Sequence, residues 1–203
     1  MKKGCLVWLL VGLGIILVIA LSAFVTVKNY YNTFVTLEEN VNQAWPQVEN
    51  VYQRRADLIP NLVEVVKGYA KHERETLQAV VEARSKVGGQ IKVGAKVLND
   101  PQAFARFQQA QDALTSALQR LMVVVERYPD LKANQNFLDL QAQLEGTENR
   151  IAVERRRFNQ AVQAYNTAIR KFPGNIIAGM FGFREKPYFK AQAGSEKVPK
   201  VKF

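Results

Sequence analysis

Five polar residues interrupt stripes of the sequence that are otherwise apolar at helical spacing, and these are the side chains best suited to chemistry: Arg55, Glu73, Gln111, Thr147 and Glu154. Carboxylates on facing helices can bind metal ions, but that arrangement needs Glu-x-x-His pairs. The single histidine, His72, stands directly before Glu73 and lacks this spacing. Buried polar groups that fix the register between helices are the simpler interpretation. We therefore predict no catalytic residue, no metal and no cofactor.

The order of the helices predicts one ion pair. Arg55 and Glu126 both fall near the same end of helices that we expect to be antiparallel, so we predict that these two side chains meet. The candidate polar seam of the chain then comprises Arg55, Glu73, Gln111, Glu126 and Glu154.

Composition excludes several classes of function. The 203 residues include one histidine and one cysteine, which excludes structural zinc, a disulfide framework and Cys–His nucleophiles. The net charge of +10 invites a nucleic-acid interpretation, but the 28 basic residues are interleaved with 18 acidic ones. The consecutive residues Arg155, Arg156 and Arg157 also fan around a helix instead of lining one face. We predict no nucleic-acid partner, and we identify no small-molecule substrate.

Residues 4–27 form a run of 24 residues without a charged side chain. As a helix this run covers ~36 Å, enough for the ~30 Å hydrocarbon core of a bilayer. A cleaved secretory signal is the alternative, because Ala20 and Ser22 satisfy the small-residue rule for cleavage after Ser22. The apolar run continues past that point, which favours a retained anchor. Positions that represent the predicted transmembrane helix are Leu6, Trp8, Gly12, Ile16, Ala20, Phe24 and Val27.

Positive charge flanking this run predicts its orientation. Lys2 and Lys3 precede it, whereas only Lys28 follows it before Glu38 and Glu39. Cytoplasmic flanks carry the excess of lysine and arginine, so we expect a cytoplasmic N-terminus and an extracytoplasmic domain. Cys5 is either an inert residue at the interface or an acylated thiol.

Helical periodicity predicts four amphipathic helices over residues 28–59, 61–87, 101–128 and 133–171. We expect a kink or restart at Pro46, a break at Pro60 and an end at Gly88-Gly89. A flexible loop is expected over 88–99, and Asp100-Pro101 signals the start of the third helix. Mostly short connections predict an all-α fold, in which one transmembrane helix precedes an antiparallel, up-and-down four-helix bundle.

The predicted organisation has three parts: the anchor over 1–27, the bundle over 28–172 and an aromatic, basic tail over 173–203. The tail aromatics either lie at the membrane interface or cap the open end of the bundle. The candidate interfacial residues are Phe172, Phe181, Phe183, Tyr188 and Phe189.

Several long segments together resemble the LemA family. They are YNTFVTLEENVNQAWPQV (31–48), QRRADLIPNLVEVVKGYAKHERETLQAVVEAR (53–84), the segment from RLMVVVERYPDL to RKFPGNIIA (120–178), FGF (181–183) and the closing VPKVKF. The sequence departs from the family pattern at Pro46, after the tryptophan, and in the link over 88–99. The resemblance implies a bacterial membrane-anchored protein with a four-helix bundle and no established catalytic residues. Some relatives are associated with magnetosome membrane formation.

From these observations we expect a non-enzymatic scaffold or adaptor in the bacterial inner membrane. Its expected partners are the lipid bilayer and either another membrane protein or a second copy of the chain. A protein that organises or shapes the membrane is the first alternative, and a ligand-binding bundle or an enzyme is the second. A well-packed interior would favour the adaptor, and a deep pocket lined by the polar seam would favour the ligand-binding bundle.

Overall fold

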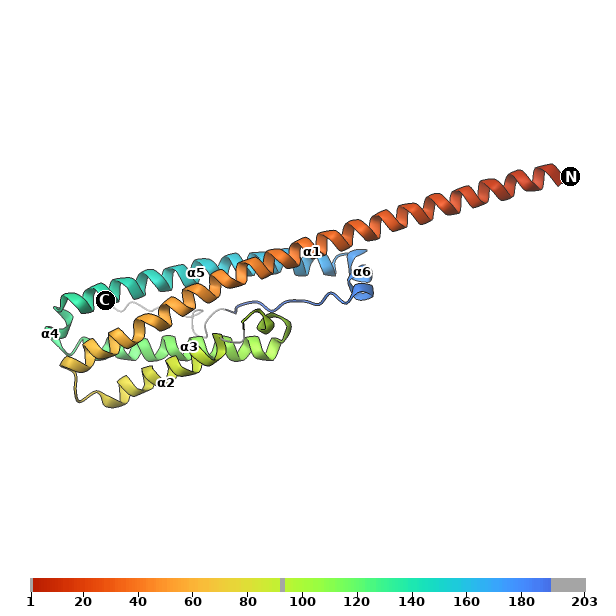
Figure 1. Ribbon diagram of the computed structural model, residues 1–203. Coiled ribbons are helices and arrows are strands. Elements are labelled where there is room, and N and C mark those ends of the chain that lie inside the picture. The colour runs from red at the N-terminus through yellow and green to blue at the C-terminus, as the bar shows by residue number, and fades with distance from the viewer. Residues whose placement is uncertain (1, 92–93, 191–203) are drawn as a thin grey trace, which may run out of the picture. The chain divides into compact units, whose positions relative to one another are not determined.

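The computed structural model describes residues 2–91 and 94–190, and every regular element in these residues is helical (Figure 1). This confirms the all-α prediction. In chain order the elements are α1 (Lys2–Tyr69), α2 (Arg74–Ile91), the short 3-10 helix η1 (Gly94–Asn99), α3 (Pro101–Val125), α4 (Pro129–Lys132), α5 (Gln135–Arg170) and α6 (Gly174–Phe181).

Helix α1 passes through both internal prolines without ending, so the predicted break at Pro60 and the predicted second helix over 61–87 are wrong. A proline inside a helix leaves the carbonyl four residues earlier without its donor. At Pro60 that carbonyl belongs to Ala56, and Arg84 Nε donates to it at 2.7 Å. Pro46 is solvent-exposed, while its neighbours Trp45 and Val48 are fully buried. A distant donor and side-chain burial therefore keep the helix continuous.

Helix α2 differs from the prediction at both ends. It begins at Arg74, after a turn in which the Glu73 amide donates to the Ala70 carbonyl at 3.1 Å. It continues past Gly88-Gly89 to Ile91, although each glycine costs a helix about 1 kcal/mol relative to alanine. The predicted loop over 88–99 is instead the end of α2 followed by η1, which buries Val97 and Leu98. Positions 92–93 of that loop lie outside the described residues.

Helix α3 begins as the sequence predicted. Asp100 is its N-cap, and the carboxylate accepts hydrogen bonds from the amides of Gln102 and Ala103, with Pro101 in the first turn. Helices α2 and α3 lie side by side (Figure 1). The buried apolar cluster of this region draws on α1, α2, α3, α4 and α5, with Leu62, Val80, Leu114, Leu131 and Phe137 as representatives.

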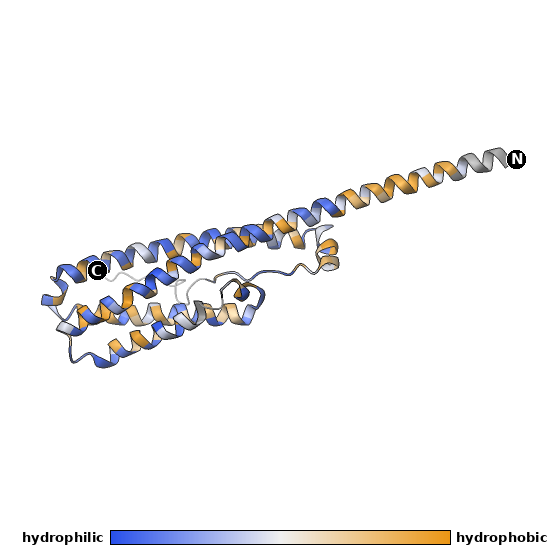
Figure 2. Cartoon of the chain, in the orientation of Figure 1, coloured by the Kyte–Doolittle hydropathy of each residue, from blue (hydrophilic) through white to orange (hydrophobic). Residues whose placement is uncertain are grey.

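The chain divides into two compact units. The anchor unit consists of Met1–Asn40 and Gln163–Glu185, and the core unit consists of Val41–Val162 and Lys186–Phe203. In Figure 2, α1 carries a long stretch of hydrophobic residues in the part that belongs to the anchor unit, whereas α2, α3 and α5 mix polar and apolar residues. Among the described helices, α1 alone is long and apolar enough to cross a membrane, and its apolar window is not buried.

Candidate functional site: the Arg55 network, the C-terminal strap and the α3–α5 groove

Arg55 is the central polar side chain of the core unit, with 1% of its surface exposed. Its Nη1 donates to Glu148 Oε1 at 2.7 Å and to the Thr115 hydroxyl at 2.9 Å. Its Nη2 donates to the side-chain oxygen of Gln111 at 2.5 Å. The guanidinium also lies 5.2 Å from the ring centre of Tyr52. The Arg55 network therefore joins α1, α3 and α5 through one cation.

The chemistry of this network suits positioning better than proton transfer. Arginine does not deprotonate in proteins, so Arg55 has no proton to exchange at ordinary pH. Burial raises the pKa of the Tyr52 phenol, and the positive charges of Arg155 and Arg55 offset only part of this rise in pKa. Among the described residues, no partner hydrogen-bonds to Arg55 Nε or Gln111 Nε2. A paired buried cation of this kind specifies which helix faces lie together.

The predicted ion pair between Arg55 and Glu126 is wrong. Arg55 pairs with Glu148 on α5, and Glu126 follows the end of α3, where Lys132 Nζ donates to it at 2.5 Å. Both members of the Glu126–Lys132 pair are more than half exposed, so this second pair contributes little stability. Placing two residues at the same end of antiparallel helices does not determine the rotation of each helix about its axis, and that rotation decides the partner.

The other seam residues are distributed over separate contacts. Glu73 accepts hydrogen bonds from Arg127 and from the Tyr128 hydroxyl, both at 3.1 Å. Glu154 accepts one from Arg157, three residues later on α5, at 2.8 Å. Of the predicted seam, the structure therefore brings together only Arg55 and Gln111. Within the described residues, no group of three or more His, Cys, Asp and Glu side chains is placed to hold a metal ion.

Sequence reasoning missed a buried aromatic cluster that includes a residue from the chain's last segment. Phe189 is 5% exposed, and its ring centre lies 4.8 Å from that of Phe104 and 5.4 Å from that of Phe158. Trp45 stacks on it at 6.2 Å and is itself fully buried. Phe189 was predicted as a candidate interfacial residue, but its side chain belongs to the interior of the core unit and is not available to lipid.

Residues 186–190, the C-terminal strap, hold Phe189 in that cluster. Phe189 and Asn159 exchange two hydrogen bonds of 2.9 Å between backbone and side-chain amide. Lys190 exchanges a second such pair with Gln108, and its carbonyl also accepts from Arg155 at 2.7 Å. Lys186 donates to Asn99 at 2.6 Å. The strap thus binds both α3 and α5, although its sequence has no periodicity that would have indicated this.

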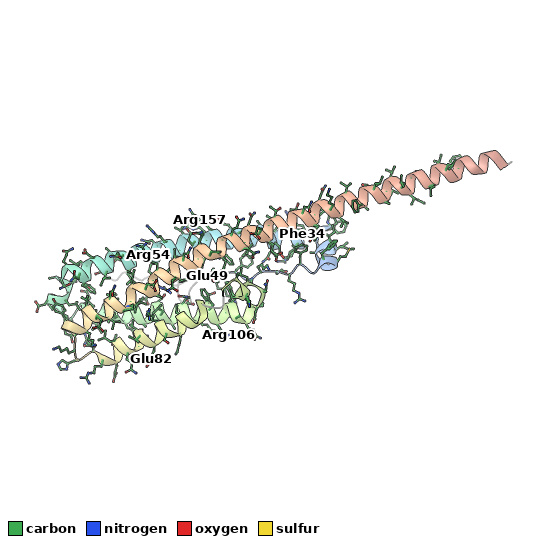
Figure 3. The ribbon with its side chains drawn as sticks, in the orientation of Figure 1. Phe34, Glu49, Arg54, Glu82, Arg106 and Arg157 are labelled. Carbon is green, nitrogen blue, oxygen red and sulfur yellow. The ribbon has the colours of Figure 1, made fainter. Side chains whose placement is uncertain are left out.

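Glu49 is a second residue that the sequence did not single out. Its Oε1 is buried, and an ideal Cβ added at Gly94 would lie 4.0 Å from it. Burial raises the pKa of the Glu49 carboxyl, and the neighbouring Trp45 indole only partly offsets this. Figure 3 shows Glu49 on the middle stretch of α1. Partial burial of the ionised carboxylate lowers the stability of the fold, and a neutral side chain at this position would avoid that cost.

A groove of about 1030 Å³ follows α3 and α5 in the core unit. It is mostly apolar, with Thr115 and Glu148 among its lining residues and Glu126 and Lys132 adding charge. Val123 and Leu138 also line it and are 70% and 41% exposed. Arg55, Gln111, Glu73 and Glu154 do not line this α3–α5 groove, which therefore differs from a deep pocket surrounded by the polar seam.

The anchor unit holds three of the remaining candidate interfacial residues. Phe172 is 79% exposed and Phe181 is 49% exposed, while Phe183 packs edge-on against Tyr31 at 5.7 Å and Phe34 at 5.4 Å. Figure 3 labels Phe34 on α1. Tyr188, which belongs to the core unit, is 40% exposed. Of the predicted transmembrane positions, Trp8, Ile16 and Phe24 are 78%, 64% and 67% exposed.

The chain belongs to the LemA family, which it matches over residues 44–203. Among curated proteins, it is 31% identical to Magnetosome protein MamQ 2 of Paramagnetospirillum magneticum, over 91% of this chain and 74% of the relative. It is 32% identical to Magnetosome protein MamQ of Magnetospirillum gryphiswaldense, over 85% and 69%. It is 24% identical to Protein LemA of Metamycoplasma hominis, over 79% and 68%. The resemblance to the LemA family inferred from the sequence is confirmed.

Proposed function

We propose that this chain is a single-pass protein of the bacterial inner membrane whose helical domain acts as a non-enzymatic scaffold or adaptor. One observation carries the proposal. Helix α1 contains the charge-free run and also Trp45, Ile59 and Leu62, which are fully buried in the core unit. The candidate membrane span and a core helix are thus a single element with no linker between them. Such a connection suits a protein that holds a partner at the membrane.

We infer that the helices of the core unit form the antiparallel, up-and-down four-helix bundle that the sequence predicts. The shared apolar cluster over α1, α2, α3 and α5 supports this arrangement, as does the four-residue turn between α1 and α2. The Arg55 network supports it further, because one cation selects a single combination of helix faces.

The adaptor is favoured over an enzyme or a ligand carrier by how the polar side chains are used. Apart from Arg55 and Gln111, which bind each other, the seam residues are engaged in separate contacts. Trp45, Phe107, Phe158 and Tyr52 fill the interior of the core unit. The α3–α5 groove is mostly apolar, and its lining residues Val123 and Leu138 are 70% and 41% exposed, which is typical of a surface that binds a protein segment.

The experiment that tests the adaptor is photocrosslinking in native membranes. A photoreactive amino acid is introduced at Val123 or Leu138 in the groove, with Arg157, which is exposed on α5, as the matched control position. We expect a discrete adduct from the two groove positions and none from the control. An adduct with the mass of two copies would identify self-association as the form of assembly. Absence of any adduct from Val123 and Leu138 would contradict the adaptor.

A membrane-organising protein is the second candidate, supported by the similarity to proteins named for the magnetosome. If this candidate is correct, the purified full-length chain alone deforms vesicles of phosphatidylcholine and phosphatidylglycerol. If the adaptor is correct, the vesicles bind the protein and keep their shape in electron micrographs.

For orientation we propose a cytoplasmic N-terminus, because Lys2 and Lys3 outnumber Lys28 at the flanks of the span. Arg170 and Lys171 bring further positive charge to the anchor unit, so a direct test is needed. Alkaline phosphatase fused after Phe203 is expected to be active, whereas fluorescence of a cytoplasmic reporter at the same position would reverse the orientation.

A further inference from the structure

Helix α6 is a short apolar helix without a charged residue, and one side of it is largely exposed. Its sequence is GNIIAGMF, in which Ile176 is 55% exposed, Met180 70% and Phe181 49%. Phe172, two residues before the helix, is 79% exposed. In water the exposed parts of these side chains would forgo the favourable free energy that apolar surface gains on leaving water. This surface therefore needs a nonaqueous neighbour.

The position of α6 along α1 identifies that neighbour. A shallow hollow of about 560 Å³ in the anchor unit is lined on one side by α1 residues from Val18 to Val27 and on the other by Ile176, Ile177 and Met180 of α6. The α1 residues belong to the charge-free run 4–27. A hydrocarbon core needs ~20 helical residues. Even the most N-terminal placement of that core, residues 4–23, includes Val18, Ile19, Ser22 and Ala23.

We propose that α6 is embedded in the acyl-chain region of one leaflet beside the anchor, as a second membrane-inserted element that does not span the bilayer. The inference rests on the proposed function, since it requires that residues 4–27 lie in a membrane. It assigns lipid acyl chains, and not a protein, as the occupant of the hollow and of the outer surface formed by Ile176 and Met180.

The residues around α6 match the chemistry of a membrane interface. Tyr31 packs edge-on against Phe181 at 5.0 Å and against Phe183 at 5.7 Å, which forms an aromatic collar at the level where such side chains gather in membrane proteins. Lys171 precedes α6 and Arg184 follows it, both exposed, whereas the helix itself carries no charge. Cations at both ends of an uncharged helix suit contact with phosphate headgroups while the helix reaches below them.

The close fit of the start of α6 shows that it is held against α1 within the anchor unit. An added Cβ at Gly174 would lie 2.6 Å from the Ala168 carbonyl oxygen and 3.1 Å from Phe34 Cζ. Only glycine allows the chain to turn from α5 into α6 at this distance from Phe34. The depth of α6 is therefore set by packing on α1 and does not depend on the lipid.

The test is depth-dependent fluorescence quenching on the full-length chain in vesicles of phosphatidylcholine and phosphatidylglycerol. Cys5 is replaced by serine, and a single cysteine is introduced as Ile176→Cys or Met180→Cys and labelled with an environment-sensitive dye. Two reference variants are Ile19→Cys, in the span, and Val123→Cys, which is equally exposed but lies in the core unit. Quenching is compared for lipids that carry the spin label on the acyl chain or on the headgroup.

We expect dyes at 176 and 180 to be quenched by acyl-chain labels nearly as strongly as the dye at 19, and several-fold more than the dye at 123. Quenching at 19 with water-like values at 176 and 180 would overturn the inference and leave the anchor intact. Protection of 176 and 180 from iodide without quenching by lipid would also overturn it, because a protein surface would then cover α6. Absence of quenching at 19 would overturn both the anchor and this inference.

Discussion

The two compact units use the same apolar side chains in opposite ways. In the core unit Ile59, Leu62 and Val66 have no exposed surface, whereas in the anchor unit Ile16 and Ile19 are 64% and 62% exposed. Burial of apolar surface is the main stabilising contribution in water. The core unit obtains this contribution from its own side chains, whereas the charge-free run of the anchor unit leaves its apolar side chains exposed. Under the proposed membrane anchor, exposure of this run reflects contact with a second solvent, the lipid, and is not a packing defect.

Charged side chains show the same contrast. Arg55 in the core unit has a fully buried guanidinium paired at 2.7 Å with Glu148. Arg170 in the anchor unit lies 3.7 Å from Glu185, and both side chains are more than half exposed. Exposed pairs contribute roughly 0–1 kcal/mol, while removal of one partner from a buried pair is far more costly. Specificity of helix packing is therefore concentrated in the core unit.

The largest effect should come from Phe189. Replacing Phe189 with alanine empties the centre of the aromatic cluster and is expected to lower the free energy of unfolding by about 3–5 kcal/mol. Phe172→Ala is the matched control in the anchor unit, because that phenylalanine is 79% exposed and its loss leaves no cavity. Thermal and denaturant unfolding of the full chain in detergent measures both. Equal losses for the two variants would remove the distinction between the units.

The next effect concerns Arg55. Arg55→Met removes four hydrogen bonds and leaves Gln111 and Glu148 without their donor, at an expected cost of about 2–4 kcal/mol, reduced by the partial exposure of Glu148. Arg54, the exposed neighbour labelled in Figure 3, provides the control Arg54→Met, for which we expect a change within about 0.5 kcal/mol.

A double-mutant cycle with Glu148→Gln isolates the contribution of the ion pair. We expect the two changes to be non-additive by roughly 1–2 kcal/mol, because each alone already removes the same contact. Additive losses would show that Arg55 stabilises the core unit through Gln111 and Tyr52 and not through Glu148.

The sequence predicted local features of the fold well and distant ones poorly. The start of α3 follows from Asp100 and Pro101 alone, because a capping carboxylate acts on amides two and three residues away. The continuity of α1 at Pro60 could not be predicted in this way. It depends on Arg84, which is 28 residues further along the chain and supplies the hydrogen bond that proline removes.

The candidate site shows the same limit. Periodicity correctly placed Arg55 and Gln111 on buried helix faces, but the partner of Arg55 depends on the stagger and rotation of α5, which no spacing reveals. Phe189 lies in an extended segment with no repeating pattern, so burial of that one aromatic, and exposure of Tyr188 beside it, could be learned only from the structure.

A third prediction tests whether the anchor unit has internal packing of its own. Gly174→Ala places a methyl group against the Ala168 carbonyl and Phe34, and we expect it to destabilise the docking of α6 by about 1–3 kcal/mol. Gly179→Ala, in the same helix with nothing within 4 Å of the added carbon, should stabilise α6 by about 0.5–1 kcal/mol. Hydrogen exchange of the α6 amides measures both. Slower exchange in Gly174→Ala would show that α6 does not pack against α1 as described.

The smallest expected effect concerns Glu49, whose carboxylate oxygen Oε1 is buried in the core unit. Burial raises the pKa of Glu49 above its ordinary value of 4.5, so the folded chain binds this proton more readily than the unfolded chain does. Stability contributed by the group is therefore present at low pH and is lost as the pH rises through the folded-state pKa. Glu49→Gln removes this loss. Because Glu49 is only partly buried and water screens its charge, we expect the free energy of unfolding at pH 7 to rise by no more than about 0.5 kcal/mol, or ~1–2 °C in Tm.

Whether Glu49→Gln raises or lowers the Tm, more than the size of the change, distinguishes a carboxylate that burial destabilises from one that a partner stabilises. The difference in Tm between Glu49→Gln and the unmodified chain should shrink as the pH is lowered from 7 toward 4.5, because the native carboxyl becomes neutral in the fold first. Glu82→Gln, which removes one charge from the exposed face of α2, corrects for the change in net charge. A difference that grows on acidification would mean that Glu49 is stabilised as a carboxylate. The core unit would then stabilise an ionised side chain on α1.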